Sequence, residues 1–225
     1  MSVAGRTLTG MTKHEGAGAT PRSAGDGVQR YYAEFADALA ERYESVTFEE
    51  VHAEVLHLLP APPARAADIG SGTGRDAAAL ARRGYDVVAV EPVAALREVA
   101  GRLHADAPVA WRTGALPALE SLAGGLDLIL LSAVWMHLDA DQRPWAMRRL
   151  AELLAPAGRL VLSLRNGPPP ADRRMYDVPG DETAALAERC GLRVRHLSGG
   201  GADRLGRADV HWSHLVVEKP EAAAG

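Results

Sequence analysis

The sequence feature that most restricts the fold is a short segment, 68–76, in which glycine occupies three alternate positions. It reads Asp-Ile-Gly-Ser-Gly-Thr-Gly-Arg-Asp, and it lies between an apolar stretch, 66–70, and a stretch with helical periodicity, 76–83. Glycines are needed where a chain turns sharply after a strand and where its backbone approaches a ligand closely. The segment therefore predicts a strand, a tight turn and a helix, in that order.

Beyond this segment, apolar strands alternate with helices. Strands are expected over 86–90, 109–113, 126–132 and 159–164, and helices over 93–104, 141–154 and 181–190, with a turn at 156–158. Two last strands, 192–197 and 212–218, are joined by a link rich in Gly and Asp, which favours a hairpin. The sequence therefore predicts an α/β fold, a Rossmann-like doubly wound sheet that is mostly parallel, with an antiparallel last strand.

The segment before the first strand has a helical pattern over 29–59. Thr47 and Glu50 have the spacing of a capping box, which predicts that a second helix begins there. Three prolines between 60 and 63 end that helix. We expect a disordered N-terminal tail, 1–27, a helical cap, 28–60, one ligand-binding domain, 61–219, and a C-terminal tail, 220–225.

Composition excludes several classes of protein. The formal net charge is −4 at pH 7, without the basic surplus of general nucleic-acid binders, so no nucleic-acid partner is expected. No apolar run is long enough to span a membrane, and residues 1–27 lack the apolar core of a secretory signal. A single cysteine, Cys190, fits a reducing compartment, so we expect a cytoplasmic protein. No spacing predicts a metal site, and the oligomeric state is left open.

Two readings of the glycine segment compete. Gly72-x-Gly74-x-x-Ala77 satisfies a dinucleotide-binding pattern, and Glu91 ends the next strand, where a carboxylate can accept hydrogen bonds from a ribose. These features alone suit an NAD-dependent oxidoreductase. That reading ignores Asp68 and Gly70, and the chain has no separate catalytic domain for it.

The whole order of motifs resembles the class I S-adenosylmethionine-dependent methyltransferases. Asp68-x-Gly-x-Gly-x-Gly74 is similar to their first motif, and Val87-Val-Ala-Val-Glu-Pro92 to their second. Segment 113–117 resembles the part of the family that lies beside the adenine. Segment 127–138 resembles its fourth strand and the following loop, and segment 153–161 resembles the turn into its fifth strand. The resemblance covers roughly residues 31–219.

This resemblance implies S-adenosyl-L-methionine as the cofactor. Asp68 is then expected to hold its amino group, directly or through water, and Glu91 its ribose hydroxyls. Many members of the family have an acidic residue where this chain has Ala115, so adenine recognition must differ here. The implied cofactor-binding residues are Asp68, Gly70, Ser71, Gly72, Glu91, Pro92, Gly114, Ala115, Leu116, Ser132 and Ala133.

Methyl transfer is an in-line displacement that mainly requires an aligned acceptor and exclusion of water. His137, just past the fourth strand, is the candidate catalytic residue, as a base or as a group that orients the acceptor; the alternative is a partly buried structural histidine. Arginines after the fifth strand are candidates to bind a carboxylate or phosphate. The candidate substrate-binding residues are Tyr32, Tyr43, Trp135, Arg165, Arg173, Arg174 and Tyr176.

The functional hypothesis is methyl transfer to a small-molecule acceptor. It depends on the acidic charge balance, on the arginine-bearing loop, and on segment 166–170, which does not match the signature of DNA amino-methyltransferases. Three alternatives remain: an S-adenosylmethionine-dependent cyclase, a non-catalytic subunit that binds the cofactor, and the oxidoreductase.

Overall fold

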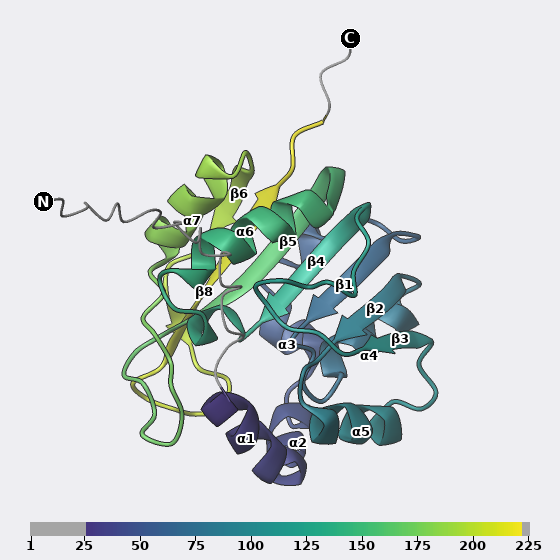
Figure 1. Ribbon diagram of the computed structural model, residues 1–225, viewed down its shortest axis with the longest axis vertical. Helices are drawn as coiled ribbons and strands as arrows, with labels where there is room; N and C mark the ends of the chain where they lie inside the picture. Colours follow the sequence, from purple (N-terminus) through teal and green to yellow (C-terminus); the bar gives the residue numbers. More distant parts are fainter. Residues whose placement is uncertain (1–25, 222–225) are drawn as a thin grey trace, which may run out of the picture.

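Eight strands form the central sheet of the computed structural model, which describes residues 26–221 (Figure 1). Their order is β3-β2-β1-β4-β5-β8-β6, and the short β7 pairs with β8. β1 to β5 are parallel, whereas β8 lies antiparallel between β5 and β6, so the predicted sheet is confirmed. The strands are Arg65–Ile69 (β1), Asp86–Val90 (β2), Val109–Arg112 (β3), Leu126–Ser132 (β4), Leu154–Asn166 (β5), Arg193–Leu197 (β6), Gly201–Ala202 (β7) and His211–Glu218 (β8).

Helices cover both faces of the sheet. α6 and α7 lie in front of the sheet in Figure 1. α1 and α2 lie against α5, at the lower end of the molecule in the same view. The helices are Asp26–Glu34 (α1), Ala36–Glu44 (α2), Phe48–His52 (α3), Arg75–Arg82 (α4), Ala94–Leu103 (α5), Gln142–Leu153 (α6) and Gly180–Arg189 (α7), with 3-10 turns at Leu56–Leu58 and Trp135–His137.

β4 explains why the sheet is covered on both faces. Ile129 and Leu131 pack into one apolar cluster with α6 and α7, and Leu128 and Leu130 pack into a second cluster with α3 and α4. Successive side chains of a strand point to opposite faces, so a nearly continuous apolar strand has to be buried on both sides. This burial fixes the positions of the strand ends on which the site is built.

The helical cap is more broken than its periodicity predicts. The first helix is interrupted at Phe35, which separates α1 from α2. The capping box is confirmed: Thr47 Oγ1 accepts from the Glu50 amide, and the Thr47 amide donates to Glu50 Oε2. The helix that it begins ends at His52, and the chain then turns so that Val55 is fully buried in the core.

Three predicted boundaries differ from the structure. Residues 156–158, expected as a turn, lie within β5, because the backbone of 157 and 158 hydrogen-bonds to Lys219. The link 198–209, expected as a long hairpin loop, contains β7. The expected N-terminal tail, 1–27, lies outside the described residues except for its last two, which begin α1; of the expected C-terminal tail only 220 and 221 are described.

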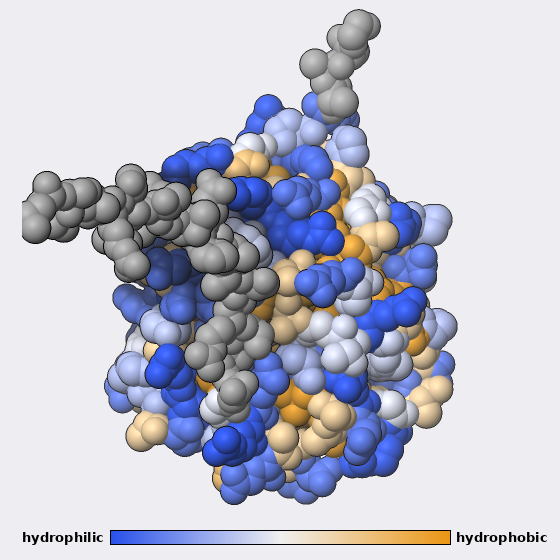
Figure 2. Space-filling view, in the orientation of Figure 1, coloured by the Kyte–Doolittle hydropathy of each residue, from blue (hydrophilic) through white to orange (hydrophobic). Residues whose placement is uncertain are grey.

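Polar residues predominate on the face drawn in Figure 2, with smaller apolar patches among them. Within 26–221, none of the helices combines the length and the apolar character needed to cross a membrane.

Candidate functional site

A cavity of about 410 Å³ lies where the parallel strands end at their carboxyl side. Ligands of open α/β sheets bind in such positions, because the loops that follow the strands diverge there. All eleven predicted cofactor-binding residues line this cavity: Asp68, Gly70, Ser71, Gly72, Glu91, Pro92, Gly114, Ala115, Leu116, Ser132 and Ala133.

The turn after β1 requires glycine at its first position. Gly70 has φ +69°, and its amide donates to the Val90 carbonyl of β2 at 2.7 Å. A Cβ atom at this position would lie 2.6 Å from Val134 Cγ2, so any side chain would collide with the loop after β4. Gly72, with φ +56°, has no atom within 4 Å of a Cβ position, which leaves space above the turn.

Asp68, the penultimate residue of β1, is 1% exposed. Neither of its oxygens has a hydrogen-bond partner among the described residues. Burial, together with the nearby charges of Asp76 and Glu91, raises the pKa of this carboxyl well above its usual range. A buried acceptor without a partner is unfavourable, so this position fits a ligand with a cationic hydrogen-bond donor.

Glu91, just after β2, is held rigidly by backbone donors. Its Oε2 accepts from the Gly72 amide at 3.0 Å, and its Oε1 accepts from the Val93 amide at 2.8 Å. Burial raises its pKa, and the two amides act in the opposite direction. Each carboxylate oxygen keeps further acceptor capacity, so the group can bind a pair of neighbouring hydroxyls.

An apolar wall follows β2 and β3. Leu116 and Leu96 are 3% and 2% exposed, and Pro92 and Ala115 line the cavity beside them. The methyl side chain of Ala115 offers no hydrogen bond, so only backbone groups of 114–116 can recognise a polar ring edge there. This wall suits a flat aromatic group.

The ends of β4 and β5 are joined by a hydrogen bond that sequence reasoning missed. The Ala133 amide donates to Ser163 Oγ at 2.8 Å, and Ser132 is the register partner of Ser163. Ala133 has φ +59°, which turns the chain away from the strand at this point. Ser163 also lines the cavity, but a serine within an apolar strand gave no signal of this.

His137 lies in the loop after β4, next to the helical cap. Its Nδ1 is 3.3 Å from the Arg174 carbonyl, which can only accept, so Nδ1 carries the proton. The Tyr32 hydroxyl of α1 therefore donates to Nε2, at 3.1 Å. Burial lowers the pKa of His137 to about 4, with the nearby Arg173 charge acting in the same direction, so the imidazole is neutral at pH 7.

The predicted substrate-binding residues separate into two groups. Tyr32, Tyr43, Arg165 and Arg173 all line the cavity with His137, although they lie in three distant parts of the sequence. Arg173 stacks over the ring of Tyr31 at 4.5 Å and pairs with Asp172 at 2.8 Å.

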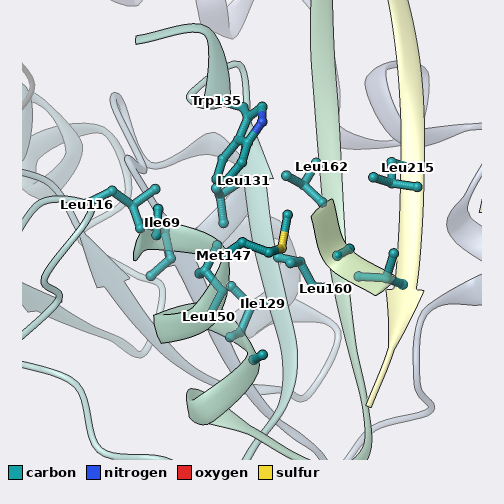
Figure 3. Packing of buried hydrophobic residues seen from close by; sticks show 14 of the residues in the cluster. Ile69, Leu116, Ile129, Leu131, Trp135, Met147, Leu150, Leu160, Leu162 and Leu215 are labelled. Carbon is teal, nitrogen blue, oxygen red and sulfur yellow. The ribbon is translucent and has the colours of Figure 1, made fainter. Parts of the chain in front are cut away.

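Trp135, Arg174 and Tyr176 do not line the cavity, contrary to our expectation. Trp135 is fully buried among Leu131, Leu162 and other residues of the core (Figure 3), since the 3-10 turn after β4 directs its ring inward. Arg174 is exposed and contributes only its carbonyl to His137. Tyr176 lies beneath the Arg143 guanidinium, 5.8 Å from it.

Sequence reasoning also missed the wall formed by the turn after α3, by the segment between β7 and β8, and by β8 itself. Glu54, Asp203, Trp212 and His214 line the cavity there. Asp203 accepts from Arg207 and from the Trp212 indole, at 2.6 and 2.8 Å. The glycine-rich link gave no sign of this wall, because only the return of β8 alongside β5 brings it to the site. Within the described part of the chain, no group of three or more His, Cys, Asp or Glu side chains is arranged to hold a metal ion.

The sequence matches the family described as "Methyltransferase domain" over residues 32–197. Uncharacterised methyltransferases of Mycobacterium bovis and Mycobacterium tuberculosis are each 34% identical over 106 residues, which make up 47% of this chain and 41% of those proteins. The match to these curated relatives thus spans less than half of their length.

Two solved structures have a similar fold. A TehB-like SAM-dependent methyltransferase from Corynebacterium glutamicum aligns with a TM-score of 0.64 and 19% identity, over 83% of this chain and 98% of that one. The [4+2]-cyclase SpnF aligns with a TM-score of 0.68 and 15% identity, over 93% of this chain and 100% of that one.

Proposed function

Since this chain belongs to the methyltransferase domain family, we propose that it transfers a methyl group from S-adenosylmethionine to a small-molecule acceptor. The observation that carries the proposal is the buried, unpartnered carboxylate of Asp68 beside the Gly70 turn, with Glu91 fixed nearby by backbone amides. These groups match the ammonium and the ribose diol of that cofactor.

Each side of the cavity has a role in this proposal. Asp68 binds the cofactor's amino group, and Gly70, Ser71 and Gly72 pack against its methionine part. Glu91 accepts from the ribose hydroxyls. Pro92 and the backbone of 114–116 enclose the adenine, and Ser132 and Ala133 line the sulfur side. When bound, S-adenosylmethionine supplies a methyl group on a positively charged sulfur.

The remaining residues position the acceptor and exclude water, which is the main requirement of this reaction. Tyr32 and Tyr43 of the helical cap close one side of the cavity. A base works best when its pKa is near the operating pH, and the pKa of His137 is about 4. We therefore assign to His137 an orienting role, through Tyr32, in preference to a role as general base.

The proposal includes a cytoplasmic protein whose partner is a small molecule and not a nucleic acid. The net charge of −4 and the single cysteine support this view. The site supports it as well, because four of the predicted acceptor residues, Tyr32, Tyr43, Arg165 and Arg173, line a cavity.

Calorimetric titration with S-adenosylhomocysteine and with NADH tests the cofactor. We expect S-adenosylhomocysteine to bind and NADH not to bind. Glu91→Ala should weaken binding about 100-fold, because it removes two charge-assisted hydrogen bonds from a buried site. The matched control is Glu98→Ala, an exposed glutamate of α5. Binding of NADH alone, or equal affinity of both variants, contradicts the cofactor assignment.

A turnover screen tests methyl transfer itself. Small acids, amines and phenols are incubated with S-adenosylmethionine, and both the release of S-adenosylhomocysteine and a 14-dalton gain in acceptor mass are measured. The second readout separates methyl transfer from the use of the same cofactor by a cyclase or a non-catalytic subunit. Tight cofactor binding without any methylated product across the screen contradicts the methyltransferase proposal.

A further inference from the structure

Five arginines line the cavity, and four of them are neutralised or reach solvent. Arg75 pairs with Asp76 at 2.6 Å, Arg173 with Asp172 at 2.8 Å, and Arg207 with Asp203 at 2.6 Å. Arg204 is exposed. The fifth, Arg165, is 6% exposed and forms no ion pair with any described residue.

Arg165 is held in place by the backbone of the loop that follows β5. Its Nη1 donates to the Gly167 carbonyl at 3.2 Å, and its Nη2 donates to the Pro168 carbonyl at 2.9 Å. Its Nε is buried and has no partner among residues 26–221. The guanidinium is therefore fixed at its Nη end. Its other edge, which consists of the Nε hydrogen and the second Nη2 hydrogen, is a flat pair of donors that is unused.

Arg165 lies on the acceptor side of the site. Arg165 lies two residues beyond Ser163 on β5, on the same face of the strand. Two residues of strand span about 6.6 Å. Ser163 contacts the Ala133 amide, which lines the sulfur side of the proposed cofactor position. Arg165 is thus placed to reach the acceptor, and not the cofactor's carboxylate near Gly70.

The surroundings of Arg165 do not compensate its charge. Burial lowers the pKa of this guanidinium, and the charges of Arg207 and Arg173 act in the same direction. Asp203 is the acidic group that opposes them, but it already accepts hydrogen bonds from Arg207 and Trp212. A buried cation without a counterion is strongly unfavourable. An anionic group on the ligand removes that penalty.

We propose that Arg165 binds a carboxylate of the acceptor, so that the substrates of this protein are small carboxylic acids. This inference rests on the proposed function. A carboxylate matches the flat, fork-like donor pair of an arginine. It also matches the charge, because one buried, uncompensated cation balances one monoanion. A phosphate monoester carries a charge of about −1.5 to −2 at pH 7. Glu50 and Glu54 also line the cavity, and their carboxylates disfavour the additional negative charge of a phosphate.

Binding to the protein saturated with S-adenosylhomocysteine tests the inference without knowledge of the natural substrate. The probes are hexanoate and benzoate, their neutral amides hexanamide and benzamide, and phenyl phosphate. Ligand-observed NMR titration gives the affinities. We expect each acid to bind about tenfold or more tightly than its amide, as charge-assisted hydrogen bonds are stronger than neutral ones, and phenyl phosphate to bind less well than benzoate.

Three variants separate recognition from folding. Arg165→Met removes the charge at similar length and should abolish the preference for acid over amide. Arg165→Lys keeps the charge but lacks the pair of parallel donors of a guanidinium, and it should retain part of that preference. Arg148→Met, an exposed arginine of α6, is the matched control and should retain all of it. Because the readout is a ratio of affinities, a general loss of stability does not imitate the expected result.

The outcomes are distinct. Equal binding of acids and amides, absence of binding by either, or an unchanged ratio in Arg165→Met overturns the carboxylate assignment, while the proposed function stands if S-adenosylhomocysteine binds. Tighter binding of phenyl phosphate than of benzoate assigns the site to phosphates, and this result also overturns the carboxylate assignment. If S-adenosylhomocysteine fails to bind, the proposed function fails, and the ratio of acid to amide is measured on the protein alone.

Discussion

The two halves of the cavity are built in different ways. The cofactor half consists of the loops after β1, β2 and β3, with Asp68, Gly70 and Glu91, and depends on backbone geometry and short side chains. The acceptor half consists of long side chains, among them Tyr32, His137 and Arg165, which come from segments far apart in the sequence. The first half is fixed by a local turn, whereas the second exists only when the sheet is complete.

The halves also differ in the sign of their unsatisfied charge. Asp68 leaves a buried carboxyl group, negative when ionised, without a partner at one end, and Arg165 leaves a buried positive group at the other. A cofactor with an ammonium and a sulfonium suits the first, and an anionic acceptor suits the second. The two ligands would then attract each other across the site, which favours the approach of the acceptor to the methyl group.

The strongest test of this comparison is Gly70→Ala in the cofactor half. The new Cβ would meet Val134 at 2.6 Å, on a backbone whose φ of +69° disfavours any side chain. The displaced turn should lower the affinity for S-adenosylhomocysteine about 100-fold, while backbone strain of about 2 kcal/mol should lower the stability. Calorimetry measures the affinity, and urea unfolding measures the stability of the same sample.

The matched control for that variant is Gly191→Ala. Gly191 has a similar φ of +81°, but nothing lies within 4 Å of its Cβ position, and it follows α7 away from the cavity. It should lose stability through the same backbone strain and keep its full affinity. If both variants lose affinity equally, the turn at Gly70 has no special role in binding.

Asp68→Asn should have the next largest effect. Loss of the charge weakens the bond to the cofactor's ammonium and lowers the affinity about tenfold. The wild-type affinity should also depend on pH. The pKa of Asp68 is raised in the free protein, and the cofactor's ammonium requires the ionised carboxylate. The affinity is therefore highest above that pKa and falls as the pH falls through it.

Calorimetry of both proteins between pH 8 and pH 5 measures this dependence. In Asp68→Asn the affinity should vary much less over the same range. An identical pH dependence in the two proteins would assign the titrating group elsewhere, with Glu91, whose pKa is also raised, as the next candidate.

The same contrast explains what the sequence predicted. Asp68, the glycines and Glu91 lie within 24 consecutive positions, and each reflects a local backbone requirement, so their common location could be predicted. Ser163, Asp203 and Trp212 had no such local pattern. The pairing of β5 with β4 brings Ser163 to the site, and the return of β8 beside β5 brings Asp203 and Trp212 there. Trp135 shows the opposite error: its place after β4 suggested the cavity, but the direction of a side chain in a short turn depends on packing.

In the acceptor half we expect an effect smaller than those of the two variants above, and it is measured by spectroscopy. Nitrogen-15 NMR should show His137 protonated at Nδ1 and neutral down to a pKa of about 4, because burial opposes its charged form. Tyr32→Phe removes the donor to Nε2 and should shift that nitrogen's resonance, with S-adenosylhomocysteine affinity changed by less than about twofold, since Tyr32 contacts the acceptor side. A His137 pKa near 6.5 would restore its candidacy as a general base.

The smallest effect concerns one of the contacts between the helical cap and the cofactor half. Glu44 of α2 accepts from Thr73 Oγ1 at 2.7 Å and faces His104 Nε2 at 3.4 Å. Although burial raises the pKa of Glu44, the hydrogen bonds of His104 and Thr73 outweigh this effect and lower it. Glu44→Gln keeps an acceptor but loses the charge, so we expect a loss of about 0.5–1 kcal/mol in the free energy of unfolding at pH 7.

Urea unfolding of the wild type and of Glu44→Gln measures this contact, and Glu41→Gln, an exposed glutamate of the same helix, is the control. Because the pKa of Glu44 is lowered in the folded state, its contribution is present above the unfolded pKa of 4.5 and is lost as the pH falls through the folded value. The difference between the two proteins should therefore shrink toward zero on acidification. A difference that persists below that range would mean that Glu44 acts through its shape and not its charge.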